Sequence, residues 1–314
     1  MKLIKKFFIL LILTSCFLSG CHSNHKQNDD YDSTDAVQSE TIEANETKKM
    51  KILSEPSKDV TLKKNICYQK SEGDKCYMDV AYRKNGKKKP LMLCVHGGSW
   101  KSGSKETMNN FLYTFSDYGY VVASIDYDVL PDATIVEQEE CIEKALEYII
   151  RKANIYEIDS QKIILLGSSS GAQLVLRFTE EVVENQTNYN FHINSVVDLF
   201  APADLNYYLE VNAMSEDAKE QLAVSIDGKT NSDIVTELKK IDVMQNVSKK
   251  LPSILILHGR EDTVVPISIS ETFYKRLQEE GISSKFVAIS EMKHEIYSEK
   301  VFPEIRQFLG EEIK

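Results

Sequence analysis

The sequence predicts an α/β protein with a mostly parallel central sheet of about eight strands, helices on both faces and a small insertion. Short, continuous apolar runs recur along the chain, as in strands that are buried on both faces of a sheet. Longer segments with apolar residues at helical spacing lie between these runs. Strands that alternate with helices form right-handed crossovers, which make the sheet largely parallel.

Residues 1–20 are typical of a secretory signal peptide, because a lysine-containing start is followed by the apolar run Phe7–Leu13. This run is too short to cross a bilayer as a helix, which needs about 20 residues. The ending Leu18–Cys21 resembles the lipobox of bacterial lipoproteins. That resemblance implies cleavage before Cys21, a diacylglycerol on its thiol and an anchor on the extracytoplasmic face of a bacterial membrane. The alternative is a plain signal peptide in which the cysteine occurs by chance.

Residues 21–55 are predicted to form the lipidated cysteine and a disordered acidic tether. The stretch 22–49 is polar and acidic and has too few large apolar side chains to offset the entropy of ordering.

The formal net charge of the chain is −10. Binding to nucleic acid depends on Lys and Arg neutralising phosphates, so this charge argues against a nucleic-acid partner.

A single folded domain is expected over residues 56–314, and it begins with paired strands at 66–70 and 76–83. The turn Glu72–Asp74 separates these strands, which belong at one edge of the sheet as an antiparallel pair. If they form a hairpin, Cys67 and Cys76 face each other and bridge outside the cytoplasm. The alternative is two free thiols on strands.

The later elements follow the same logic. The apolar run at 91–95 predicts a buried strand, and Ile142, Leu146 and Ile149 recur at helical spacing within 134–153. The remaining predicted strands are 120–125, 162–166, 195–200, 253–257 and 285–289, and the remaining helices are 105–117, 173–183, 269–278 and 301–309.

Residues 204–250 interrupt the alternation of strands and helices with two short helices. An insertion after a parallel strand lies at the carboxyl edge of the sheet, so we expect a cap over a site. The alternative is a peripheral excursion without substrate contact.

Gly167–Gly171 directly follows one predicted strand and directly precedes a helix. In that position a Gly-x-Ser-x-Gly sequence forms a tight turn that exposes its central serine. Ser169 is therefore the candidate nucleophile, and the backbone N–H of Ser170 is available to an oxyanion. Taken alone, the same sequence also fits a helix N-terminus that binds an anion.

Two further motifs end strands at the same edge. His96–Trp100 contains glycines that let backbone N–H groups point at a developing negative charge. His258–Asp262 follows the strand at 253–257 and presents Asp262 on a loop, where a carboxylate can orient an imidazole. Of the six histidines, His294 follows a strand at this edge, whereas His96 and His258 open glycine turns that they are expected to support. The chain order Ser169, Asp262, His294 is the order of serine, acid and base in α/β-hydrolases.

With these motifs in place, residues 62–312 resemble the α/β-hydrolase family, specifically its esterase/lipase branch with an HGGxW oxyanion motif. The matching features are His96–Trp100 with Gly103 and Lys105 after it, Asp126-Tyr127, Gly167–Gly171, and Asp262–Pro266. The resemblance implies the α/β-hydrolase fold, with Gly98, Ser99 and Ser170 as oxyanion donors through their N–H groups. Feruloyl and acetylxylan esterase-like members fit best. The chain departs from the pattern at Ser99, where lipase-like members often have glycine, and at Asp128, where many have arginine.

The sequence therefore predicts a serine carboxylic-ester hydrolase that transfers acyl groups through Ser169, His294 and Asp262. Small or carbohydrate-linked acyl esters at the cell surface are the expected substrates. No cofactor is implied, and the His and Cys spacing contains no zinc-type cluster. One alternative is a serine peptidase of the same fold, and another is a surface binding protein without catalytic activity.

Overall fold

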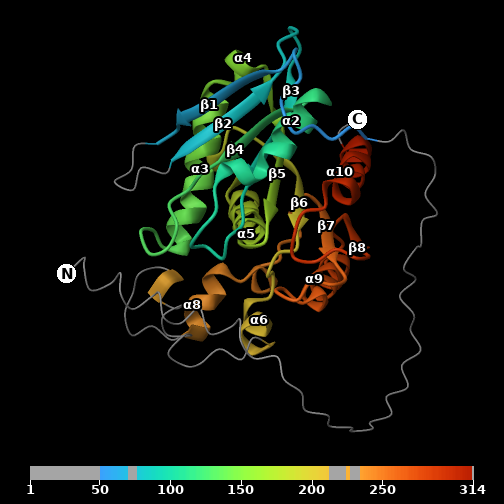
Figure 1. Cartoon of the computed structure of the whole chain (residues 1–314). Coiled ribbons are helices and arrows are strands. Elements are labelled where there is room, and N and C mark those ends of the chain that lie inside the picture. The colour runs from blue at the N-terminus through green and yellow to red at the C-terminus, as the bar shows by residue number, and fades with distance from the viewer. Residues whose placement is uncertain (1–49, 70–75, 212–223, 227–233, 313–314) are drawn as a thin grey trace. The chain divides into compact units, whose positions relative to one another are not determined.

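A computed structural model of the chain describes residues 50–69, 76–211, 224–226 and 234–312 (Figure 1). Within these residues one sheet has eight strands in the order β1-β2-β4-β3-β5-β6-β7-β8. Its strands are β1 (Thr61–Cys67), β2 (Tyr77–Tyr82), β3 (Lys89–Val95), β4 (Val121–Ile125), β5 (Ile158–Ser168), β6 (Ile193–Leu199), β7 (Ser253–Gly259) and β8 (Ser284–Ile289). β2 pairs antiparallel with β1 and β4, and all other pairs are parallel. The predicted α/β fold with an antiparallel edge is confirmed.

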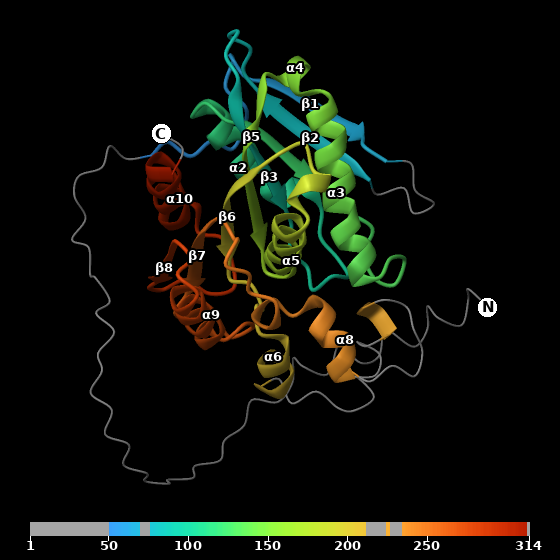
Figure 2. The same ribbon diagram turned by 180° about the vertical axis from the view of Figure 1, so that it is seen from behind.

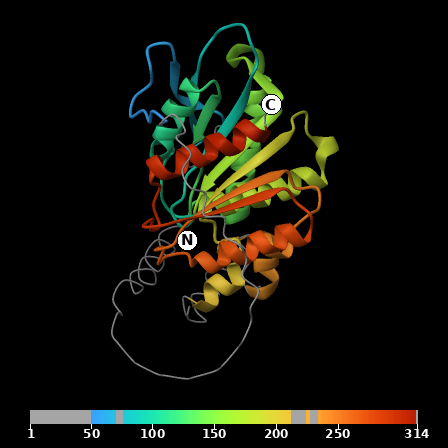
Figure 3. The same ribbon diagram turned by 90° about the vertical axis from the view of Figure 1, so that its right-hand side faces the viewer.

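Helices cover both faces of this sheet. The described α-helices are α2 (Asn109–Asp117), α3 (Ile135–Arg151), α4 (Ala153–Tyr156), α5 (Ser170–Glu184), α6 (Leu205–Val211), α8 (Ile234–Ile241), α9 (Ile267–Glu279) and α10 (Ser298–Glu312). Short 3₁₀ turns occur at η2 (Lys105–Met108), η3 (Gln186–Asn188) and η4 (Val243–Gln245). α2 and α10 lie together on one face, where the rings of Phe111 and Phe302 are 4.5 Å apart. α3 and α5 lie together on the other face (Figures 2 and 3).

The continuous apolar strands explain why both faces need helices. Leu91, Leu93 and Val95 of β3 belong to the large core cluster that also holds residues of α3, α5 and α9. The alternate residues Met92 and Cys94 are equally buried and point to the opposite face, because successive side chains of a strand alternate. A sheet of this kind is stable only as the middle layer of three, and its polar loops gather at the strand ends.

The possible Cys67–Cys76 disulfide is not formed. Cys67 is paired across the hairpin with Tyr77 rather than with Cys76. A register offset of one residue turns the two side chains to opposite faces of the sheet. Cys76 is buried whereas Cys67 is exposed, and the Cys67 thiol contacts the carbonyl of Gln69 at 3.2 Å. Of the two readings that the sequence left open, the structure therefore has two thiols without a disulfide.

The insertion after β6 contains the two described short helices α6 and α8, which lie beyond the same end of the sheet (Figures 1 and 2). Residues 51–314 form one compact unit, so its start lies five residues before the predicted domain boundary. The predicted signal peptide 1–20, Cys21 and the tether up to residue 49 lie outside the described residues. None of the described helices is both long and apolar enough to cross a membrane.

Candidate active site

The turn from β5 into α5 presents Ser169 with backbone angles of φ 52° and ψ −124°. A serine in this region is strained, and the flanking glycines allow it. A Cβ atom on Gly167 would lie 2.3 Å from the carbonyl oxygen of Gly171. A Cβ atom on Gly171 would lie 2.3 Å from the carbonyl oxygen of His96. The two glycines therefore let β5, α5 and the end of β3 meet closely below the serine.

His294 lies within hydrogen-bonding distance of both Ser169 and Asp262. The Nε2 atom of His294 is 2.9 Å from the hydroxyl oxygen of Ser169, and its Nδ1 atom is 2.7 Å from Oδ2 of Asp262. A carboxylate accepts only, so Nδ1–H donates to Asp262 and Nε2 is left to accept the serine proton. The structure thus brings together the three residues that the sequence selected, from the ends of three different strands.

The turn after β7 fixes the carboxylate of Asp262. Its Oδ1 atom accepts the backbone N–H groups of Val264 at 2.8 Å and Val265 at 2.9 Å. Burial alone would raise the pKa of this carboxyl, but hydrogen bonds from His258 and His294 outweigh it and hold the pKa of Asp262 well below its usual range. The carboxylate therefore stays ionised and supplies a fixed negative charge beside the imidazole.

His258 is a second imidazole on the same carboxylate, with Nε2 at 3.2 Å from Oδ2 of Asp262. Nε2 is also 2.9 Å from the carbonyl oxygen of Val265, which can only accept. Nε2 therefore carries a proton, and Nδ1 is 2.8 Å from the hydroxyl oxygen of Ser270. His258 supports the loop, as the sequence suggested. Ser270 was not found from the sequence.

The proposed oxyanion turn follows β3 and packs on the serine turn. Gly98, Ser99 and Trp100 have φ values of 133°, 54° and 60°. A Cβ on Gly98 would lie 2.0 Å from the carbonyl oxygen of Ser102, so only glycine fits there. Within the described ranges, no hydrogen-bond acceptor is assigned to the N–H groups of Gly98, Ser99 or Ser170. These three groups remain available to an anion beside Ser169.

Lys105 and Asp126 support the base of this turn. The Lys105 backbone N–H donates to Oδ1 of Asp126 at 2.7 Å, and its ammonium is 3.1 Å from Oδ2. The same ammonium is 3.8 Å from a carboxylate oxygen of Asp79. The next residue, Tyr127, donates its hydroxyl to the carbonyl of His96 at 2.8 Å. Lys105 thus supplies the cation beside Asp126.

Phe200 and Asp198 at the end of β6 were not identified from the sequence. The Phe200 ring lies 4.7 Å from the His294 ring, and φ of Phe200 is 50°. Asp198 is fully buried, and burial raises its pKa to about 7, although the Ala201 N–H bonded to it opposes the shift. The only signal for either residue was its position at the end of a strand beside β5.

Among the described residues, no group of three or more His, Cys, Asp or Glu side chains is arranged to hold a metal ion.

A family model described as BD-FAE matches residues 78–277, a range that contains Ser169 and Asp262. Among curated proteins, the chain is 24% identical over 215 residues to a probable isoprenylcysteine alpha-carbonyl methylesterase ICME of Oryza sativa subsp. japonica, covering 66% of this chain and 52% of that protein. It is 24% identical over 211 residues to Esterase LipC of Mycobacterium tuberculosis, covering 64% and 52%. The chain thus spans about half the length of these curated relatives.

Among solved structures, the chain is similar to an inhibited esterase B from Lactobacillus rhamnosis, with a TM-score of 0.70 and 19% identity over 82% of this chain and 88% of that one. It is also similar to a truncated carbohydrate esterase from gut microbiota, with a TM-score of 0.66 and 20% identity over 82% and 98%. At these identities the likeness shows the fold, which is that of the α/β-hydrolases.

Proposed function

The chain belongs to the BD-FAE family, and from that premise we propose that it is a serine carboxylic-ester hydrolase acting through Ser169, His294 and Asp262. One observation carries the proposal: a single imidazole links a strained, partly exposed serine at 2.9 Å to a buried carboxylate at 2.7 Å. This arrangement is what nucleophilic acyl transfer needs, because the serine must lose its proton as it attacks. The curated relatives named as esterases support the same reaction.

In the first step, Ser169 Oγ attacks the ester carbonyl while Nε2 of His294 takes its proton. The carbonyl π electrons move to the oxygen, which becomes an oxyanion held by the N–H groups of Gly98, Ser99 and Ser170. Asp262 stabilises the imidazolium and keeps Nδ1 protonated. When the oxyanion collapses, the bond to the alcohol breaks and His294 returns its proton to the leaving oxygen.

In the second step, water attacks the acyl group on Ser169. Nε2 of His294 takes a proton from that water, and the same N–H groups hold the second oxyanion. Collapse breaks the bond to Ser169 Oγ, which recovers its proton from His294, and the carboxylic acid leaves. The reaction needs no group beyond the chain and water.

For substrates, we propose small acyl esters, including esters on carbohydrates. The similar structure named as a carbohydrate esterase supports this class, and so does the resemblance of the oxyanion motif to feruloyl and acetylxylan esterase-like enzymes. The insertion containing α6 and α8 follows β6 at the carboxyl end of the sheet, where ligands bind in folds of this type. We propose that it caps the site.

For location, we propose the extracytoplasmic face of a bacterial membrane, with a diacylglycerol on Cys21. The support is the basic and apolar start of the chain and its Leu-Ser-Gly-Cys ending. Replacing Cys21 with alanine should move the protein from the membrane fraction to the soluble or secreted fraction. An unchanged distribution, together with no lipid on Cys21 by mass spectrometry, would contradict the anchor.

The reaction is tested with p-nitrophenyl acetate, butyrate and octanoate, with Ser169→Ala as the control. We expect turnover of the short esters that falls by at least about 10³-fold in the variant. A fluorophosphonate probe should label the wild-type protein at Ser169 and leave the variant unlabelled.

Activity on acetylated xylan or feruloyl sugars would support the carbohydrate class, whereas activity confined to lipids would contradict it. A folded protein that cleaves short peptides but none of the esters would favour the peptidase reading. A folded protein that neither turns over substrate nor reacts with the probe would favour the binding protein. Normal ester turnover by a folded Ser169→Ala variant would overturn the assignment of the nucleophile.

A further inference from the structure

The strained turn at Ser99 and Trp100 is held by contacts that the reaction scheme does not use. Both residues have positive φ values, 54° and 60°, although neither is glycine. Such backbone conformations cost on the order of 1–3 kcal/mol each and persist only where the surroundings fix them. The Ser99 side chain is exposed. Within the turn, the carbonyl of Gly98 accepts from the N–H groups of Lys101 at 3.2 Å and Ser102 at 3.1 Å. The contacts that reach the turn from other elements act on Trp100, which is 8% exposed.

Two glutamines that are each 0% exposed hold Trp100. The indole Nε1–H donates to Oε1 of Gln173 at 3.0 Å. The carbonyl oxygen of Trp100 accepts from Nε2 of Gln138 at 2.8 Å and from the N–H of Leu130 at 2.8 Å. Among the described residues, the backbone carbonyl thus has two donors, whereas the indole has the single acceptor that Gln173 provides.

The amide of Gln173 has a second partner, which fixes its direction. Its Nε2 atom donates to the carbonyl oxygen of Ile241 at 2.6 Å. Because the indole can only donate and the carbonyl can only accept, the amide has a single orientation that satisfies both. Gln173 also lies one turn into α5, where its backbone N–H donates to the carbonyl of Ser169 at 3.1 Å. One residue therefore joins the nucleophile turn, the oxyanion turn and the end of the insertion.

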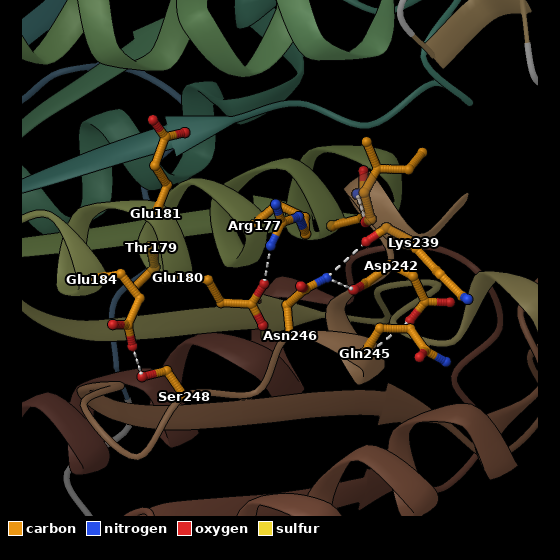
Figure 4. Close-up of polar contacts among 12 residues, drawn as sticks. Arg177, Thr179, Glu180, Glu181, Glu184, Lys239, Asp242, Gln245, Asn246 and Ser248 are labelled. Carbon is orange, nitrogen blue, oxygen red and sulfur yellow. Dashed lines mark hydrogen bonds and ion pairs between the residues drawn. The ribbon is translucent and has the colours of Figure 1, made fainter. Parts of the chain in front are cut away.

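The end of the insertion is itself fastened, so the carbonyl of Ile241 is held in place. Figure 4 shows Asn246 donating to the carbonyls of Lys239 and Asp242, at 3.0 and 2.8 Å. In the same view Ser248 contacts Glu184 at the end of α5. The segment that leaves α8 is thus attached to α5 on the far side of Gln173.

We propose that Gln173 is a positioning residue that locks the Ser99–Trp100 turn to the nucleophile helix and to the end of the insertion. It touches no substrate, and it acts by keeping the Ser99 N–H directed at the place where the oxyanion forms. The kinetic test of this inference rests on the proposed ester hydrolysis. Because Trp100 is the only tryptophan of the chain, its fluorescence provides a second test that is independent of activity.

The main variant is Gln173→Met, which keeps the length of the side chain and removes both hydrogen bonds. We expect kcat on p-nitrophenyl acetate to fall about 10- to 100-fold with KM changed less than about threefold, because an oxyanion donor acts mainly in the transition state. Thr179→Val is the matched control. Thr179 is also buried on α5 and donates to the carbonyl of Val175, but it has no contact with Trp100. This control should leave kcat unchanged.

The second variant is Trp100→Phe, which removes the indole N–H and keeps an aromatic ring. If Gln173 acts through Trp100, Gln173→Met should lower kcat little further in the Trp100→Phe background. Additive losses in the double variant, or a Gln173→Met protein with wild-type kcat, would overturn the inference. Either result would leave the proposed reaction intact, since Ser169→Ala tests that separately.

The fluorescence emission of Trp100 is the test that does not require turnover of a substrate. Loss of the Gln173 acceptor should shift the emission maximum and increase quenching by acrylamide, whereas Thr179→Val should change neither. Unchanged emission and quenching in a folded Gln173→Met protein would also overturn the inference. If Gln173→Met does not fold, Trp100→Phe alone should still lower kcat without changing KM. A wild-type kcat in Trp100→Phe would contradict the proposed role of the Gln173–Trp100 contact.

Discussion

At the residue scale, backbone strain is concentrated around the candidate nucleophile. Ser99, Trp100, Ser169 and Phe200 have φ values of 54°, 60°, 52° and 50°, and none of them is glycine. These residues come from three separate loops, and two of them, Ser169 and Phe200, contact His294. Strain of this kind is retained where function needs a fixed geometry. The serine turn was predictable from its flanking glycines, but no sequence pattern marks Phe200 as strained.

Asp262→Asn tests the orienting carboxylate. Asparagine keeps an oxygen for the N–H groups of Val264 and Val265, so the turn should survive. It cannot act as the charged acceptor of both His294 and His258, so the His294 ring loses its fixed tautomer. We expect kcat to fall by about 10³- to 10⁴-fold. Esterase assays beside thermal unfolding check this, and a folded variant within tenfold of wild-type kcat would argue against the role of Asp262.

At the scale of elements, the eight strands were predictable because most of them are buried on both faces and their sequences are continuously apolar. The exception is β1, which was placed at 66–70 and lies at Thr61–Cys67. Most of its residues are exposed, because it is the edge strand, so no apolar run marks its limits. The possible disulfide supposed that Cys67 and Cys76 face each other across this hairpin, whereas Cys67 pairs with Tyr77. The limits of an exposed edge strand are less clearly marked in a sequence than those of a central strand, so the pairing of Cys67 was also hard to predict.

The contact between β3 and α5 predicts opposite effects for two glycines. A Cβ on Gly171 would lie 2.3 Å from the carbonyl oxygen of His96 and 2.5 Å from that of Val95, both backbone atoms of the β3 end. Gly171→Ala should therefore cost several kcal/mol or prevent folding. Gly310→Ala on α10 meets nothing within 4 Å and should raise stability by up to about 1 kcal/mol. Denaturant unfolding measures both, and equal midpoints for Gly171→Ala and wild type would refute the packing argument.

The buried carboxyl of Glu139 on α3 predicts a stability that depends on pH. Burial raises its pKa to about 8, against the attraction of Arg177, and the carboxyls of Glu180 and Glu181 add to the rise. The folded protein thus holds this proton more tightly than the unfolded chain. The resulting stabilisation is complete below the unfolded pKa and is lost as pH rises toward 8.

Glu139→Gln cannot lose a proton, so its free energy of unfolding should rise relative to that of the wild type by about 4 kcal/mol between pH 5 and pH 9. The exposed neighbour Glu140 provides the control, because Glu140→Gln removes the same charge at the surface. Thermal unfolding at several pH values gives the comparison. A difference between Glu139→Gln and wild type that stays constant with pH would show that Glu139 does not titrate in this range.

At the scale of the whole molecule, topology explains why the distant candidates meet. Ser169, Asp262 and His294 follow the carboxyl ends of β5, β7 and β8, and parallel strands bring those ends to one edge of the sheet. Their motifs and their positions just after predicted parallel strands were therefore enough to select them. Gln173, Gln138 and Ser270 lie inside helices, and their roles depend on which side chain a neighbouring helix presents. Sequence spacing does not contain that information, so these contacts appear only in the folded structure.

The compact unit from Lys51 to Lys314 includes five residues before the predicted boundary at residue 56, and their contribution to stability can be measured. The backbone N–H of Lys51 donates to the hydroxyl of Tyr118 at 3.1 Å, and that of Leu53 donates to the hydroxyl of Thr114 at 2.9 Å. A protein starting at Lys51 keeps both hydrogen bonds and should match the full chain in its thermal unfolding midpoint and in kcat/KM.

A protein starting at residue 56 loses both hydrogen bonds, and its thermal unfolding midpoint should fall by roughly 2–6 °C. Its kcat should remain unchanged, because the loss lies at α2 and away from Ser169. Equal midpoints for the two proteins would place the boundary where the sequence predicted it, whereas a lower midpoint for the Lys51 protein than for the full chain would mean that residues before Lys51 also stabilise the fold.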